Sequence, residues 1–209
     1  MKQYALITGS YWVFTLTDGA LRMLVVLYFH ELGYSPLDIA FLFLFYEFFG
    51  IITNLFGGWL AARIGLSATI ISGLFLQTFA LGMLLVDSSY LTVAYVMAAQ
   101  ALSGVAKDLN KLGAKSSVKL VAGDNQTKLY RWVAWLTGSK NALKGVGFFA
   151  GGAGLATIGF TASVITMALC VGVGGVVALL LLDTNLGKAS FKPKFSELFS
   201  KSRQINLLS

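Results

Sequence analysis

The stretch "GVGFFAGGAGLATIGFTASVITMALCVGVGGVVALLLL", residues 145–182, contains no charged side chain, and it decides the fold class. A helix needs about 20 apolar residues to cross a hydrocarbon layer about 30 Å thick, so this stretch is too long for a single crossing. The glycine-containing segment "IGF" at 158–160 is a turn signal. We therefore predict two membrane-spanning helices in this region, at 128–155 and 160–182.

The composition of the whole chain extends this prediction. Hydrophobic residues make up 56% of the 209 residues and charged residues only 12%, whereas charged residues reach about 25% in soluble domains. A soluble globule of this size could not bury so many apolar side chains, so we expect the lipid bilayer to cover much of the surface. The net charge of +7 therefore indicates membrane topology, and we expect no nucleic-acid partner.

Four more segments have the length and apolar character of membrane spans. The six predicted spans are 4–29, 36–60, 66–86, 90–118, 128–155 and 160–182. β-Barrel strands would be about half as long and would alternate in polarity, and these segments do neither. The predicted fold class is an all-α membrane protein, with a bundle of six transmembrane helices in residues 1–182.

The positions of lysine and arginine predict how the bundle is oriented. The basic residues outside the spans lie in alternate connections and in the tail: Lys2, Arg63, Lys119, Lys128, Arg131, Lys188, Lys192, Lys194, Lys201 and Arg203. The connections at 30–38 and 86–89 have none. Because basic loops stay on the cytoplasmic side, both termini should be cytoplasmic in a cell inner (plasma) membrane. Residues 183–209 are predicted to form a basic cytoplasmic linker, and we expect the chain to be part of a longer protein.

The first two spans carry ionisable residues at depths where a charge costs about 2.5–3.5 kcal/mol. Asp18 and Arg22 lie one turn apart on one helix face. They either neutralise each other structurally or form a gate or substrate site. Glu47 is surrounded by phenylalanines, and burial there disfavours its charged form, so it is a candidate carrier of a coupled proton. The alternative is that Glu47 is the structural partner of a basic residue.

The fifth span contains the strongest functional signal. Lys140 and Lys144 share a helix face, with Asn141 beside them. Lys140 lies about 18 Å along the helix from its predicted start near residue 128. Snorkelling moves an ammonium group only a few ångströms toward water, so it cannot bring this one to either surface. We predict that all three residues belong to an internal site.

Four lysines recur at every fourth position in "SGVAKDLNKLGAKSSVK", residues 103–119. Lys115 and Lys119 lie near the predicted cytoplasmic surface and are interpreted as topological anchors. Lys107 and Lys111 are deeper, so we predict that they face the bundle interior together with Asp108.

These predictions place five cations against three acids inside the bundle. The cations are Arg22, Lys107, Lys111, Lys140 and Lys144, and the acids are Asp18, Glu47 and Asp108. An excess of buried positive charge indicates a small anionic substrate, such as a phosphate ester. Enzyme motifs do not occur: the single histidine, His30, lies in a predicted outer loop, and there is no phosphate-binding loop or nucleophile elbow. We expect no catalytic activity, cofactor or metal site.

Six spans followed by a basic linker resemble the N-terminal half of a major facilitator superfamily transporter. The segment "GGWLAARIG" (57–65) is similar to the signature between spans two and three of that superfamily. Gly58, Arg63 and Gly65 match the signature, whereas Ala62 replaces its aspartate and Leu66 its final basic residue. The resemblance implies a gating role for Arg63 and a second six-helix half that completes the transporter.

The glycine-rich fifth span also resembles the fifth-helix motif of the superfamily. Gly147 and Gly151 lie one turn apart in this span. Small residues at this spacing permit a close approach between two membrane helices.

A more specific resemblance is to the ArsJ-type organoarsenical efflux transporters. It is carried by "YWVFTLTDGALRMLVVLYFHELGYSP", "FLFYEFFGIITNLFGGWLAAR", "AYVMAAQALSGVAKDLNK", "LTGSKNALKGVGFF" and "KPKFSELFSKSR". The resemblance implies export of 1-arseno-3-phosphoglycerate and hence arsenate resistance. It also implies a functional link to glyceraldehyde-3-phosphate dehydrogenase, which makes this compound when arsenate replaces phosphate.

Two alternatives remain at this stage. The chain could belong to an exporter of another organophosphate or organic anion, because the residues alone do not identify arsenic. It could also be a non-transporting membrane scaffold whose buried charges are structural pairs. The scaffold interpretation predicts balanced charge, which the excess of cations disfavours.

Overall fold

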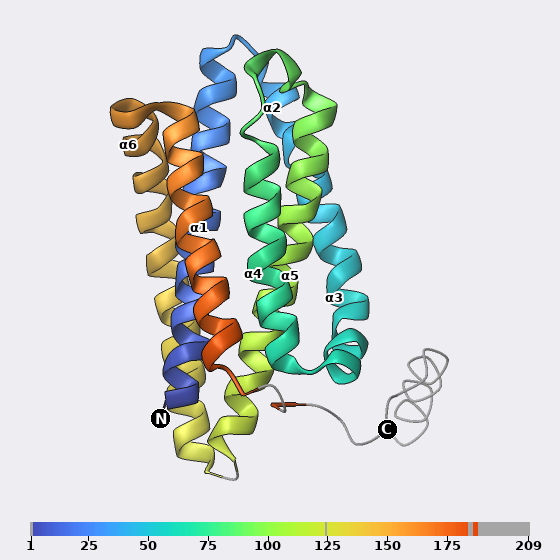
Figure 1. Ribbon diagram of the computed structural model, residues 1–209, viewed down its shortest axis with the longest axis vertical. Helices are drawn as coiled ribbons and strands as arrows, with labels where there is room; N and C mark the ends of the chain where they lie inside the picture. The colour runs from blue at the N-terminus through green and yellow to red at the C-terminus, as the bar shows by residue number, and fades with distance from the viewer. Residues whose placement is uncertain (1, 124, 184–185, 188–209) are drawn as a thin grey trace.

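The computed structural model describes residues 2–123, 125–183 and 186–187, and these residues form a helical bundle without strands (Figure 1). Its helices are α1 (Lys2–Glu31), α2 (Pro36–Leu42), α3 (Leu44–Ile64), α4 (Leu66–Met83), α5 (Val93–Ala122) and α6 (Gln126–Leu181), with a short 3₁₀ turn η1 (Ser88–Tyr90) before α5. The predicted linker at 183–209 lies almost entirely outside the described residues.

The longest helix, α6, is two antiparallel spans joined at a kink. Gly159 has φ 78° and ψ 176°, a left-handed conformation that glycine adopts without the penalty of a Cβ atom. Figure 1 shows the chain rising to this point and returning alongside itself. The predicted break at 158–160 is therefore confirmed, and the described bundle has six long helical segments when α2 is counted with α3.

Four of the helices are long and apolar enough to cross a membrane on length and composition alone: α1, α2 with α3, α4, and α6. The exception among the predicted spans is α5. It runs parallel to the others in Figure 1 but carries the lysine row, which lowers its hydropathy. Large apolar side chains elsewhere face outward, for example Leu55 at 69% and Phe149 at 79% exposure. A lipid environment accounts for these exposed side chains.

The predicted second span, 36–60, is interrupted at Phe43, where α2 ends and α3 begins. A capping box starts α2: Ser35 accepts a hydrogen bond from the Asp38 backbone N–H, and the Asp38 carboxylate accepts one from Ser35. The break puts Tyr46 and Glu47 at the start of α3, facing α1 and α5.

The ends of the helices alternate between two ends of the bundle. The N-terminus, the α3–α4 turn and the end of α6 meet at one end, where Gln3 donates to the Leu181 carbonyl and Ser67 to the Asp183 carbonyl. The described basic loop residues lie in the first or last two turns of helices, and in Figure 1 those helix ends are at this end of the bundle: Lys2 in α1, Arg63 in α3, Lys119 in α5, and Lys128 and Arg131 in α6. At the opposite end, the Ser89 backbone N–H and hydroxyl donate to Asp87 and lower the pKa of that exposed carboxyl.

Glycines let the helices that carry the charged residues approach closely. A Cβ atom on Gly19 of α1 would lie 2.7 Å from the Lys144 carbonyl oxygen of α6. A Cβ atom on Gly104 of α5 would collide with the backbone carbonyl of Tyr46. The predicted close approach at Gly147 is observed as well, because this glycine packs against the backbone of Leu16 and Gly19.

Candidate functional site

A polar cavity of about 220 Å³ lies between α1, α3, α5 and α6, and we call it the central cavity. The lining residues are Tyr11, Phe14, Thr15, Asp18, Arg22, Glu47, Lys107, Lys111, Lys140 and Lys144. Asp18 is about 24 Å along α1 and Lys140 about 21 Å along α6, so the cavity lies near the middle of the bundle. All five cations predicted from the sequence meet in it.

Glu47 is the acid that bridges two of these cations. One carboxylate oxygen lies 2.6 Å from the Arg22 guanidinium, and the other lies 3.4 Å from the Lys107 ammonium. The structural alternative for Glu47, a partner for basic residues, is therefore observed. Its side chain is nevertheless 57% exposed, so this carboxylate is accessible from outside the protein core.

Asp18 has a partner other than the predicted one. It is buried, and it accepts a hydrogen bond from the Tyr46 hydroxyl at 2.5 Å. The guanidinium of Arg22 and the ammonium of Lys107 each lie 4.1 Å from the centre of the Tyr46 ring. Tyr46 thus holds the acid with its hydroxyl and two cations with its ring, which supports both kinds of charge at this depth.

Asp108 is buried behind the cavity wall, at 2% exposure. Its two carboxylate oxygens lie 3.0 Å from Lys111 and 3.8 Å from Lys107. Lys111 also reaches the side-chain oxygen of Asn54 at 3.5 Å. Asp108 therefore fixes the two lysines of α5 and leaves their ammonium groups in the cavity lining.

The two lysines of α6 differ from the other cations. Within residues 2–123, 125–183 and 186–187, neither Lys140 nor Lys144 forms an ion pair with a carboxylate. The Nε atom of Arg22 is also buried without a hydrogen-bond acceptor in the described part of the chain. Unpaired donors and excess positive charge at mid-depth are costly unless a ligand neutralises them, so the cavity is suited to an anion.

Two predicted residues lie elsewhere. Asn141 is exposed and is not part of the cavity lining, because it is one residue, or about 100°, around the helix from Lys140. Arg63 is exposed at the end of α3, where its guanidinium lies 5.3 Å from the Trp59 ring centre. Lys115 and Lys119 are exposed, as expected for anchors.

Sequence reasoning missed the hydroxyl groups of the site. Tyr11 and Thr15 line the cavity, and Tyr46 bonds Asp18. The spacing of these residues could have indicated this. Tyr11 and Thr15 lie seven and three residues before Asp18, which puts them near the same face of the helix.

A helical membrane bundle with a charged cavity at mid-depth is the arrangement expected of a membrane transporter. Comparison with known families agrees: the family model of the Major Facilitator Superfamily matches residues 7–208. The chain therefore belongs to the major facilitator superfamily, whose members are transporters rather than enzymes. No curated protein matches the chain.

Proposed function

We propose that the protein exports a small polyanionic organoarsenical, 1-arseno-3-phosphoglycerate, by alternating access and thereby gives arsenate resistance. The observation that carries this proposal is the pair Lys140 and Lys144, which face the central cavity without an acidic partner in the described chain. A substrate with a phosphate and an arsenate ester offers several anionic oxygens to these ammonium groups. The choice of arsenic rests on the resemblance to ArsJ-type transporters.

We propose that the complete transporter has a second six-helix half. Substrate sites of such transporters lie near the membrane midplane at the interface between repeats. Residues 1–182 would supply one wall of the site, and a second six-helix half, joined through the basic linker, would supply the other. Both termini of this half would be cytoplasmic in the inner (plasma) membrane, in line with the basic residues gathered at one end of the bundle.

A genetic test separates the organoarsenical from other organophosphates. Cells that lack arsenate exporters should gain resistance from the intact gene only when glyceraldehyde-3-phosphate dehydrogenase is also active, because this enzyme makes the proposed substrate. Growth at increasing arsenate concentration is the readout. Equal protection with and without the dehydrogenase would contradict the organoarsenical as substrate. No protection in either case would favour another organic anion or a non-transporting scaffold.

Three acids are candidates for coupling transport to protons: Asp18, Glu47 and Asp108. We infer that Glu47 is the coupling group, because it is the most exposed of the three and bridges Arg22 of α1 and Lys107 of α5. Protonation of Glu47 would change the net charge beside Arg22 and Lys107, and this change would link proton movement to binding of the anion. Arg63 remains a gating candidate from the superfamily resemblance alone.

Glu47→Gln should abolish proton-driven transport and retain substrate exchange across the membrane. The neutral amide can hydrogen-bond Arg22 but cannot lose a proton, so only the coupled half of the cycle is blocked. The measurements are uptake driven by a pH gradient and counterflow without a gradient, both in vesicles. Asp38→Asn is the matched control, since Asp38 is a partly exposed acid in the α2 cap and does not line the central cavity. A variant of Glu47 with normal proton-driven uptake would rule out this assignment.

A further inference from the structure

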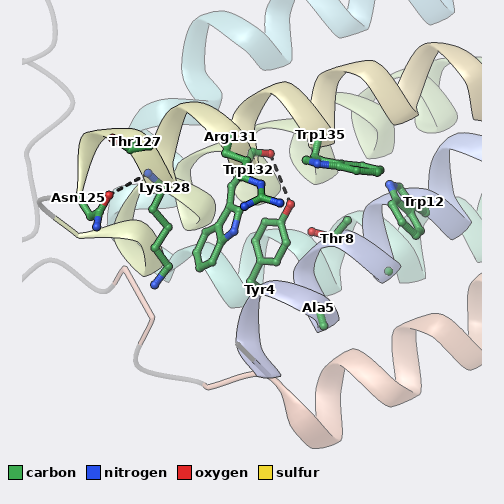
Figure 2. A pocket seen from close by; sticks show the side chains of 11 residues that line it. Tyr4, Ala5, Thr8, Trp12, Asn125, Thr127, Lys128, Arg131, Trp132 and Trp135 are labelled. Carbon is green, nitrogen blue, oxygen red and sulfur yellow. Dashed lines mark hydrogen bonds between the residues drawn. The ribbon is translucent and has the colours of Figure 1, made fainter.

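A second and larger pocket lies between the first turns of α1 and the start of α6, with a volume of about 840 Å³. We call it the aromatic pocket. Its walls include Tyr4, Trp12, Trp132 and Trp135 (Figure 2). Three of the four tryptophans of the chain therefore line one pocket. It shares no lining residue with the central cavity, so it is a separate site.

The aromatic walls are held in place by specific contacts. The rings of Tyr4 and Trp132 stack with centroids 4.2 Å apart, and the Tyr4 hydroxyl donates to the Trp132 carbonyl at 3.4 Å. The Trp12 indole N–H donates to the Ser139 hydroxyl at 2.7 Å. Trp135 is 62% exposed on the outer side of the pocket. The pocket is thus preformed, with an apolar surface that continues to the outside of the bundle.

The polar groups of this pocket are cationic or are hydrogen-bond donors. Lys128 and Arg131 line it, and no carboxylate does so among the described residues. The Lys128 ammonium lies 4.4 Å from the Trp132 ring centre, which positions the charge at the pocket. The Thr8 hydroxyl is an independent indication of a ligand: Thr8 is only 6% exposed and lines the pocket, yet its oxygen has no hydrogen-bond partner in the described structure.

The pocket lies at the end of the bundle that holds the N-terminus and the turn before α6, where the basic helix ends lie. Tryptophan and tyrosine concentrate at the membrane–water interface, where an apolar ring borders a polar headgroup layer. Basic pockets between helices on the cytoplasmic side bind anionic lipid headgroups. A soluble phosphate would use the two cations and leave the aromatic walls uncovered, whereas a phospholipid would occupy both.

We propose that the aromatic pocket binds one anionic phospholipid from the leaflet at this end of the bundle. Lys128 and Arg131 contact the headgroup phosphate, and the Thr8 hydroxyl donates to a phosphate or ester oxygen. The glycerol and the start of an acyl chain lie along Trp12 and Trp135. An anionic phospholipid fits this pocket better than a zwitterionic lipid does, because the pocket is cationic. The pocket also leads continuously from the cations to the exposed aromatic rings, where the apolar part of the lipid would lie.

Tryptophan quenching by brominated lipid tests the proposal in the intact protein. Trp59, and any tryptophan outside residues 1–209, is first replaced by phenylalanine, so that only the three pocket tryptophans report. Brominated phosphatidylglycerol should quench them at a mole fraction at least about fivefold lower than brominated phosphatidylcholine. Lys128→Gln with Arg131→Gln should remove this preference, and Thr8→Val should weaken it. Lys119→Gln, a change at an exposed lysine outside the pocket, should leave it intact.

The following results would contradict the proposal of an anionic lipid site. Equal quenching by the two lipids, or a preference that survives the double variant, would show that no anionic lipid site exists here. Relief of quenching by soluble glycerol 3-phosphate, beyond that caused by sodium chloride of equal ionic strength, would indicate a site for soluble phosphates. Native mass spectrometry provides a second readout without tryptophan changes: the wild type should retain one phosphatidylglycerol, and the double variant none.

Discussion

Replacing Lys140 or Lys144 with glutamine should lower transport at low substrate concentration by about 10- to 100-fold. Each ammonium group faces the central cavity without an acidic partner in the described chain, so the proposed function makes the substrate its main partner. A hydrogen bond to a charged group is worth about 1.5–3 kcal/mol, and about 1.4 kcal/mol corresponds to a factor of ten. The measurements are initial uptake rates in vesicles and arsenate resistance of cells that produce the intact protein.

Lys119→Gln is the matched control for these variants, because Lys119 is exposed at the end of α5 and lines neither the central cavity nor the aromatic pocket. It should transport like the wild type. Lys140→Arg keeps the charge and should recover part of the activity. If Lys140→Gln and Lys144→Gln both protect cells as the wild type does, the anion-binding role of the cavity is wrong.

Gly147→Ala should lower the apparent melting temperature in detergent by about 2–12 °C. A Cβ atom there would collide with the Leu16 carbonyl oxygen and lie 3.1 Å from both the Ala20 nitrogen and the Gly19 Cα atom, so α1 and α6 must separate. Overpacking of this kind costs about 1–3 kcal/mol, and about 1 kcal/mol shifts melting by about 2–4 °C at this size. Separation would also move Lys144 away from Arg22.

Gly145 lies on the same helix, two residues earlier, and offers the control for this change. A Cβ atom at Gly145 meets nothing within 4 Å. Gly145→Ala should therefore leave the melting temperature unchanged or raise it slightly, because alanine favours the helix by about 0.5–1 kcal/mol over glycine. Similar losses for both variants would mean that the close approach of α1 and α6 does not determine stability.

The six spans could be predicted from the sequence because they depend on local hydropathy and on turn residues. The Gly159 turn illustrates this, since its glycine was visible as a break between two apolar runs. The interruption at Phe43 was not predictable in this way. The surrounding sequence, "FLFLFYEFF", contains no glycine or proline that would indicate a break.

The sequence predicted that the cations converge and offered Glu47 as a partner for one of them, but it did not predict which cation pairs with which acid. Depth along a helix follows from residue number, so Lys140 could be placed inside the bundle from the sequence. Partner choice depends on the rotation of each helix and on which helices touch. For this reason Arg22 pairs with Glu47 rather than Asp18, and Asp18 bonds Tyr46.

Arsenic accumulation in everted membrane vesicles is the most direct test of the function proposed for the central cavity. The outer face of such vesicles is cytoplasmic, so an exporter loads them. We predict that the intact transporter accumulates arsenic only when arsenate, glyceraldehyde 3-phosphate, NAD and the dehydrogenase are all present, and that Lys140→Gln removes this accumulation. Accumulation from arsenate alone, or none with the complete mixture, would contradict export of 1-arseno-3-phosphoglycerate.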